Sequence, residues 1–89
     1  MTNQEKAYIR KTPEKIRDIT DNLYDVYFDL DETFENESER LFNIPAEKTD
    51  NDSYRNRESV NDKLGDVVYE LKQVIDKLYE IAEQAEGVL

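Results

Sequence analysis

The chain of 89 residues contains no cysteine, no histidine and no tryptophan. Without cysteine it can form neither a disulfide nor a thiolate metal site, and nothing in its cysteine usage points to secretion. Without histidine it lacks the usual general base and the commonest ligand of transition metals. We therefore expect a protein with no catalytic residues, no cofactor and no metal site.

Glycine and proline are also scarce, with two residues of each, and no apolar run approaches the length of a membrane span. The first eleven residues lack the apolar stretch of a signal peptide, so we expect a cytoplasmic protein with no membrane partner. The net charge of −10 would repel nucleic acid directly and would attract a basic protein surface.

What the chain does contain is a run of acids. Nine acidic residues and no basic one lie between positions 18 and 39, threaded through apolar residues at steps of three and four. That period predicts an amphipathic helix with an anionic face. The nine acids are Asp18, Asp21, Asp25, Asp29, Asp31, Glu32, Glu35, Glu37 and Glu39.

The periodicity predicts a first helix over residues 12–44. Thr12 suits an N-cap, Pro13 suits the first helical turn, and Pro45 ends the pattern. Residues 45–57 have no apolar period and many turn-forming residues, so they are predicted to be a loop.

A second helix is predicted over residues 58–86, and residues 1–11 form an N-terminal segment or a short helix. The expected fold is all-α: residues 1–89 make one domain, a long antiparallel helical hairpin. Gly65 lies on the polar side of the second helix, where it costs about 1 kcal/mol relative to alanine.

The second helix carries three apolar columns, which is more than one antiparallel partner helix can cover. We expect the surplus to pair with a second copy in a four-helix bundle, although the N-terminal segment could cover part of it instead. The core and dimer residues would be Ile16, Ile19, Leu23, Val26 and Leu30, with Val60, Leu64, Val67, Val68, Leu71, Val74, Ile75, Leu78 and Ile81.

Residues 26–33 resemble the first motif of the haloacid dehalogenase superfamily, an apolar strand followed by Asp-x-Asp-x-Thr. The resemblance implies that Asp29 is a nucleophile and Asp31 a general acid/base beside Mg²⁺. That fold needs further strands, and a single βαβ unit takes roughly 30 residues, yet no second strand pattern exists. On a helix the two carboxylates point about 200° apart, so the pattern disfavours an enzyme.

The same residues can be aligned with a calcium-binding EF-hand loop, with Asp29, Asp31 and Thr33 as ligands. Phe34 then occupies the position that requires glycine, and Arg40 occupies the position of the bidentate glutamate. The alignment fails at both positions, so it predicts no calcium site.

On a helical wheel, six of the acids fall within an arc of about 80°, roughly opposite the apolar stripe. Their separation of roughly 5–6 Å is close to the spacing of phosphates along one DNA strand. Tyr24 and Phe28 flank this arc outside the seam, as anchors for a basic partner would. Alternatively, the arc only solubilises a dimer, and a neighbouring chain buries the two aromatic rings. The candidate partner-binding residues are Asp18, Asp21, Tyr24, Asp25, Phe28, Asp29 and Glu32.

Three short motifs precede a Val/Leu heptad helix: Glu35-Asn36, residues 43–47 (Asn-Ile-Pro-Ala-Glu) and Ser53-x-Arg55. With these motifs, about residues 14–82 resemble small acidic helical-hairpin proteins of bacteriophages and mobile elements of low-GC Gram-positive bacteria. This chain has a longer loop and more aromatic residues than those proteins. The family has no established activity, so the resemblance implies a phage origin and a bacterial host.

We expect a non-enzymatic protein that binds a basic surface on another protein, such as a nucleic-acid-binding or host-defence protein that it inhibits by imitating DNA. A structural or assembly module, whose acids only give solubility, is the alternative.

Overall fold

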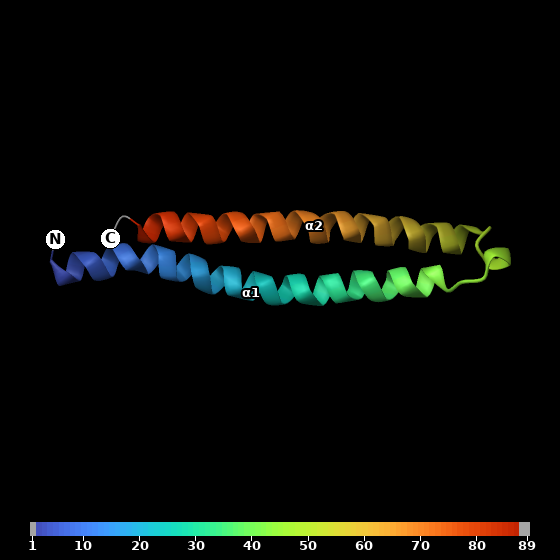
Figure 1. Cartoon of the computed structure of the whole chain (residues 1–89), viewed down its shortest axis with the longest axis horizontal. Helices are drawn as coiled ribbons and strands as arrows, with labels where there is room; N and C mark the ends of the chain where they lie inside the picture. The colour runs from blue at the N-terminus through green and yellow to red at the C-terminus, as the bar shows by residue number, and fades with distance from the viewer. Residues whose placement is uncertain (1, 88–89) are drawn as a thin grey trace.

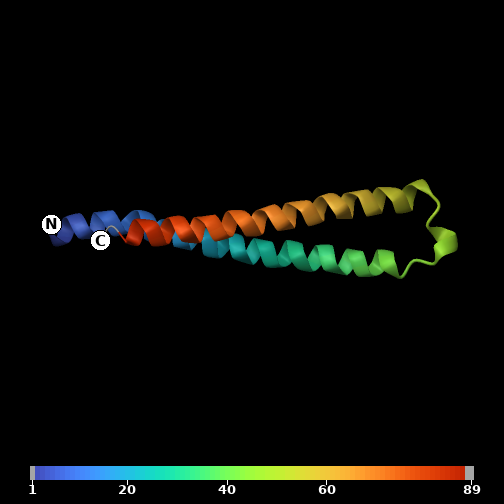
Figure 2. The ribbon, with the colours of Figure 1, turned by 45° about the horizontal axis from the view of Figure 1, so that its top comes forward.

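A computed structural model of the chain describes residues 2–87 as two long helices joined by a short connection. Helix α1 spans Asn3–Phe42, the 3-10 helix η1 spans Ala46–Lys48, and helix α2 spans Asp52–Glu86. The two long helices run antiparallel beside each other (Figures 1 and 2), and residues 2–87 include no strand. The predicted all-α hairpin is therefore confirmed. Residues 1, 88 and 89 of the predicted domain lie outside the described residues.

The hairpin is a thin rod, with principal extents of 71 × 15 × 14 Å. Its first turns project past the end of α2 (Figure 1), because α1 has 40 residues and α2 has 35. The cross-section is that of two helices side by side, so most residues outside the contact between the helices face solvent.

Helix α1 begins nine residues before the predicted start at Thr12. The Thr2 hydroxyl accepts a hydrogen bond from the Glu5 backbone N–H at 3.2 Å and caps the helix there. Pro13 consequently lies inside the helix, where it cannot donate the usual backbone hydrogen bond. Its ring is fully buried, and this burial offsets part of the loss. At the other end the Asn43 N–H donates to the Glu39 carbonyl at 3.1 Å.

Helix α2 also begins earlier than residue 58, and the connection is correspondingly shorter than the predicted loop. The Asn51 side chain caps the helix by accepting a hydrogen bond from the Tyr54 N–H at 2.8 Å, and it donates to the Lys48 carbonyl at 2.6 Å. One turn into α2, Arg57 forms an ion pair with Glu37 of α1. Residues 52–57 are thus held in the helix by a cap and by a contact with α1.

The two long helices meet along a seam whose residues recur every seven positions. Thr20, Ile75 and Ala82 are completely buried, Val68 and Leu41 nearly so, while Tyr27 and Phe34 are half-buried. The seam residues are Pro13, Thr20, Tyr27, Phe34 and Leu41 on α1, and Asn61, Val68, Ile75 and Ala82 on α2.

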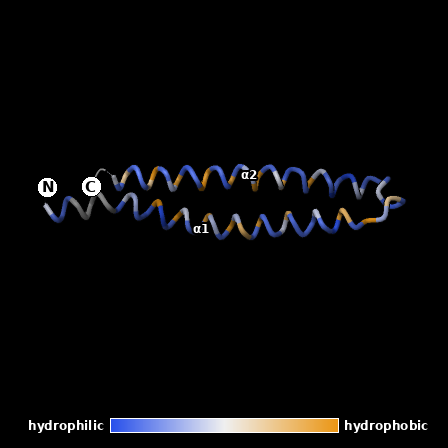
Figure 3. Tube along the Cα trace, viewed as in Figure 1, coloured by the Kyte–Doolittle hydropathy of each residue, from blue (hydrophilic) through white to orange (hydrophobic). Residues whose placement is uncertain are grey.

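This seam differs from the one expected from the aliphatic pattern. Of the apolar columns predicted on α2, only the one that contains Val68 and Ile75 is buried between the helices. Ile19 and Val26 of α1 remain 47% and 48% exposed. The coloured trace shows apolar positions recurring along both helices (Figure 3).

The helices pair through a seam of small and large residues that fit against each other. Gly65 is the clearest example, because a Cβ atom added to it would lie 2.7 Å from the ring of Phe34. Gly65 therefore lies against the seam rather than on the polar side of α2.

Polar contacts fix the register of the hairpin. Arg17 donates two hydrogen bonds to Glu86, at 2.6 and 2.9 Å, and this contact holds the pKa of Glu86 below its ordinary value. Further along, the Asn61 amide donates to the Ser38 hydroxyl at 2.8 Å. The Asn61 Oδ1 atom is buried and has no partner within the described residues.

Candidate interaction surfaces

A row of exposed carboxylates follows the outer side of α1. All of them are exposed, and none forms an ion pair with a described side chain. Arg17, adjacent to Asp18 in sequence, binds Glu86 of α2 instead. We call this row the acidic ridge, formed by Asp18, Asp21, Asp25, Asp29 and Glu32.

One member of the acidic ridge is tied to α2. The Tyr79 hydroxyl donates a hydrogen bond to the Asp21 carboxylate at 2.8 Å. This hydrogen bond, followed by desolvation, raises the pKa of Tyr79 above its ordinary value. A carboxylate that accepts one hydrogen bond keeps free lone pairs, so Asp21 can still accept hydrogen bonds from a partner.

Three aromatic rings gather beside the acidic ridge. Tyr24 packs edge-to-face on Phe28 with ring centroids 4.8 Å apart, and Tyr27 lies 5.8 Å from each of them. Phe28 is 54% exposed, whereas Tyr24 is half-buried. Tyr24 belongs to the partly buried column that includes Arg17 and Ser38, so it lies beside the seam. Only Phe28 lies on the open flank that was expected for both rings.

A second surface is apolar and runs along one side of both helices. The column farthest from the seam on α2 is about half exposed: Val60 at 57%, Val67 at 50%, Val74 at 48% and Ile81 at 49%. We call this surface the apolar face. It consists of Ile16, Ile19, Leu23, Val26 and Leu30 on α1 and of Val60, Leu64, Val67, Leu71, Val74, Leu78 and Ile81 on α2.

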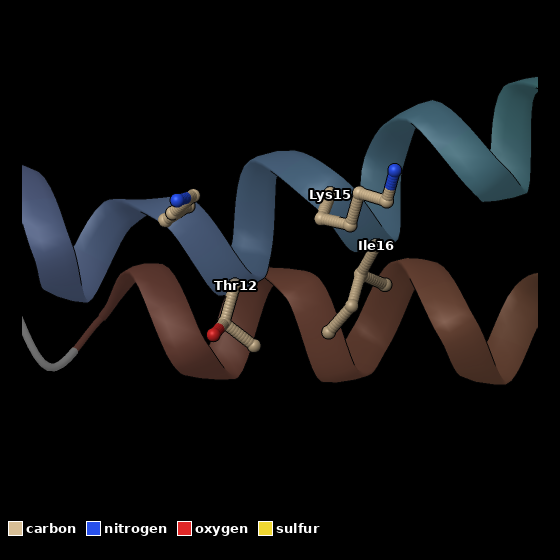
Figure 4. Close-up of a pocket in the computed structure, with 4 residues that line it drawn as sticks. Thr12, Lys15 and Ile16 are labelled. Atoms are coloured by element: carbon tan, nitrogen blue, oxygen red, sulfur yellow. The ribbon is translucent and has the colours of Figure 1, made fainter.

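Each end of the apolar face has a shallow hollow. The hollow near the termini, of about 340 Å³, is lined by Lys11, Thr12, Lys15 and Ile16; Figure 4 shows Lys15 extending away from Thr12 and Ile16. The hollow near the connection, of about 300 Å³, is lined by Thr33, Glu37, Asn56, Arg57, Val60, Asn61 and Leu64. The first hollow is lined by two lysines, and the second by the Glu37–Arg57 ion pair.

The described side chains do not converge on a metal site. No group of three acidic residues among them could hold an ion. Asp29 is exposed on the acidic ridge, and Asp31 is half-buried in the column beside the seam, so the two do not share a site. Within residues 2–87, neither helix has a stretch long and apolar enough to cross a membrane.

The sequence pattern missed the residues that join the helices. Thr20, Tyr27, Phe34 and Asn61 lie in the seam, yet none belongs to the aliphatic repeat. A spacing of seven from Pro13 to Leu41 could have revealed the α1 half of the seam.

Comparison with protein-family models, curated proteins and solved structures gave no match.

Proposed function

We propose that the protein is a non-enzymatic interaction protein that binds a basic surface of another protein through the acidic ridge. The observation that carries this proposal is that no described basic side chain pairs with the carboxylates of the ridge. The five carboxylates are exposed, and none is paired with a basic group among the described side chains. Like charges at i,i+4 on a helix destabilise it by a few tenths of a kcal/mol per pair, and binding a basic surface would relieve that repulsion.

The partner we propose is a nucleic-acid-binding or host-defence protein whose basic groove accepts the acidic ridge in place of phosphates. From Asp18 to Glu32 the ridge rises about 21 Å along α1, at 1.5 Å per residue. Phe28, 54% exposed beside it, supplies an apolar anchor of the kind found at interface hot spots. The resemblance to phage proteins makes an inhibitor acting inside a bacterial host the natural context.

The apolar face supports a dimer as the acting form, with two hairpins packed into a four-helix bundle. The chain has an accessible surface of 7010 Å². A compact monomer of 10.6 kDa has roughly 5,500 Å². The excess is larger than the roughly 800 Å² that each partner loses in a standard interface.

The alternative function is a structural or assembly module whose acids only maintain solubility. The apolar face favours it, because a hairpin that assembles through that face needs no further partner. Whether a protein is bound specifically by the acidic ridge distinguishes the two functions.

The test uses immobilised protein and an extract of the bacterial host at low and high salt. The ridge variant carries Asp21→Asn, Asp25→Asn, Asp29→Asn and Glu32→Gln. The matched control removes four acids from α2 through Asp62→Asn, Asp66→Asn, Asp76→Asn and Glu80→Gln. We expect a host protein that is retained by the wild type and the control, lost from the ridge variant, and released by salt and by competing DNA. Equal retention by all three chains would leave the acidic ridge as a solubility device.

A further inference from the structure

We propose that the apolar face is covered by a second copy of the chain, antiparallel to the first and related to it by a two-fold axis beside Val26 and Val74. This arrangement rests on the dimer proposed above and states which residues meet in it. It also determines on which side of the dimer the acidic ridges lie.

The angle between the two apolar surfaces favours a second copy. Ile19 and Val26 of the apolar face directly precede Thr20 and Tyr27 of the seam. On α2, Val67, Val74 and Ile81 likewise precede Val68, Ile75 and Ala82. Consecutive residues on a helix point about 100° apart, so each helix has two contact surfaces at nearly a right angle. A helix in a four-helix bundle contacts two neighbours in this way, and a second hairpin would supply the missing neighbour of each.

Each edge of the apolar face carries one exposed residue per heptad, and residues of α1 and α2 at the same height along the rod can be compared in charge. The contacts Asp21–Tyr79 and Ser38–Asn61 fix the levels, and they place Asp29 level with Glu70, midway between them. One heptad closer to the termini, Asn22 is level with Lys77. All the edge residues are exposed: Lys15, Asn22, Asp29 and Asn36 on α1, and Lys63, Glu70, Lys77 and Gln84 on α2.

A parallel pair of hairpins would bring like charges together. In that arrangement α1 packs against α2 of the second copy at the same level. Asp29 would then face Glu70 of the second copy, and symmetry would repeat this contact. Two pairs of carboxylates would meet beside the interface, which disfavours the arrangement.

The antiparallel pair brings opposite charges together. Here α2 packs against α2 of the second copy, so Lys77 faces Glu70 of that copy, again twice. On the other edge Asp29 faces the neutral Asn22. Lys15, from the hollow near the termini, comes close to Glu37, which already pairs with Arg57 of its own chain, so this contact adds no unbalanced charge. The edge charges therefore match in this arrangement and in this register.

The antiparallel arrangement also makes the two α1 helices neighbours. Their acidic ridges then lie on one side of the dimer, while the two α2 helices, with charges of both signs, form the other side. The ridges run in opposite directions, related by the two-fold axis, as the two strands of a DNA duplex do. A basic groove that spans both ridges would contact two copies at once.

The first test is a charge reversal read by sedimentation equilibrium of the full chain. Glu70→Lys places like charges opposite each other in the antiparallel dimer, and we expect it to weaken association about fivefold, since two exposed pairs are reversed. Adding Lys77→Glu should restore the wild-type affinity. In a parallel dimer Glu70→Lys would tighten association, because it would then face Asp29. Tighter association overturns the arrangement alone, whereas a wild-type monomer at micromolar concentration overturns the dimer as well.

The second test exploits the absence of cysteine from the chain. Cys in place of Val74, or in place of Val26, lies next to its own symmetry copy only in the antiparallel dimer. We expect each single variant, Val74→Cys and Val26→Cys, to form a disulfide-linked dimer on mild oxidation. Tyr69→Cys, at a 67% exposed position away from the apolar face, is the control and should stay reduced. If neither single variant crosslinks but the double variant does, the hairpins are parallel and the proposal is wrong.

Discussion

At the scale of single residues, the Phe34 ring limits which side chains can replace Gly65. Alanine should stabilise a helix by about 1 kcal/mol over glycine. In this chain, however, the new Cβ would lie 2.7 Å from the Phe34 ring, which would have to move. The helical gain and the packing loss therefore oppose each other at this position.

We predict that Gly65→Ala stabilises the chain only when Phe34 is also shortened. In the wild type the substitution should be neutral or destabilising, and in a Phe34→Leu background it should add about 1 kcal/mol to the free energy of unfolding. Urea unfolding of the four chains at one protein concentration measures the coupling. Equal effects in the two backgrounds would mean that the ring does not pack on Gly65.

The hydrogen bond between Tyr79 and Asp21 predicts a dependence on alkaline pH. The pKa of Tyr79 is raised above 10.0 in the folded chain. A raised pKa contributes stability that is fully present below the unfolded value and is lost as the pH rises through the folded value. The stability advantage of the wild type over Tyr79→Phe should therefore shrink above pH 10.0. Urea unfolding at neutral and alkaline pH measures it, and Asp21→Asn should return the tyrosinate absorbance of Tyr79 to the ordinary range.

At the scale of the helices, Asn61 is a buried polar residue in an otherwise apolar column of α2. Its amide binds Ser38, but its Oδ1 atom has no partner within the described residues. We predict that Asn61→Leu raises the free energy of unfolding by about 1 kcal/mol, because a buried unsatisfied carbonyl is removed. Ser38→Ala, which leaves the amide unpaired as well, should lower it by a similar amount. Thermal unfolding followed by circular dichroism compares the three chains, and a loss of stability in Asn61→Leu would contradict the prediction.

The aliphatic repeat was sufficient to predict two helices and their antiparallel pairing, since only a helix brings residues at steps of three and four to one side. It was insufficient to predict which side meets the other helix. Val67 and Val68 are equally apolar, so the aliphatic repeat does not distinguish them. In the structure Gly65 packs against Phe34, which belongs to the spacing of seven from Pro13 to Leu41 and not to the aliphatic repeat. The start of α1 was also missed, because Thr12 and Pro13 are a common beginning of a helix and Thr2 provides an earlier one. The exposure of the acidic ridge followed from its wheel position, whereas the half-burial of Tyr24 depended on the true seam.

At the scale of the whole molecule, the rod keeps its two special surfaces apart. The acidic ridge lies on the outer side of α1, and the apolar face lies on one side of both helices at nearly a right angle to the seam. Only Asp29 of the acidic ridge also lies at the edge of the apolar face, so pairing through that face would leave the other ridge residues accessible. Substitutions of Asp18, Asp21, Asp25 or Glu32 can therefore alter partner binding without changing the contacts between the two copies.

The connection between the helices has a consequence for the order in which the chain folds. The contacts between α1 and α2 span ever longer segments away from it: 20 residues for Glu37–Arg57, 23 for Ser38–Asn61, 58 for Asp21–Tyr79 and 69 for Arg17–Glu86. Closing a longer loop costs more entropy, but each contact already formed shortens the loop that the next one must close. The contacts between the helices should therefore form first near the connection and last near the termini. In hydrogen exchange, amides near Val68 should be protected longer than those near Ala82, because the contacts that form last are the first to break.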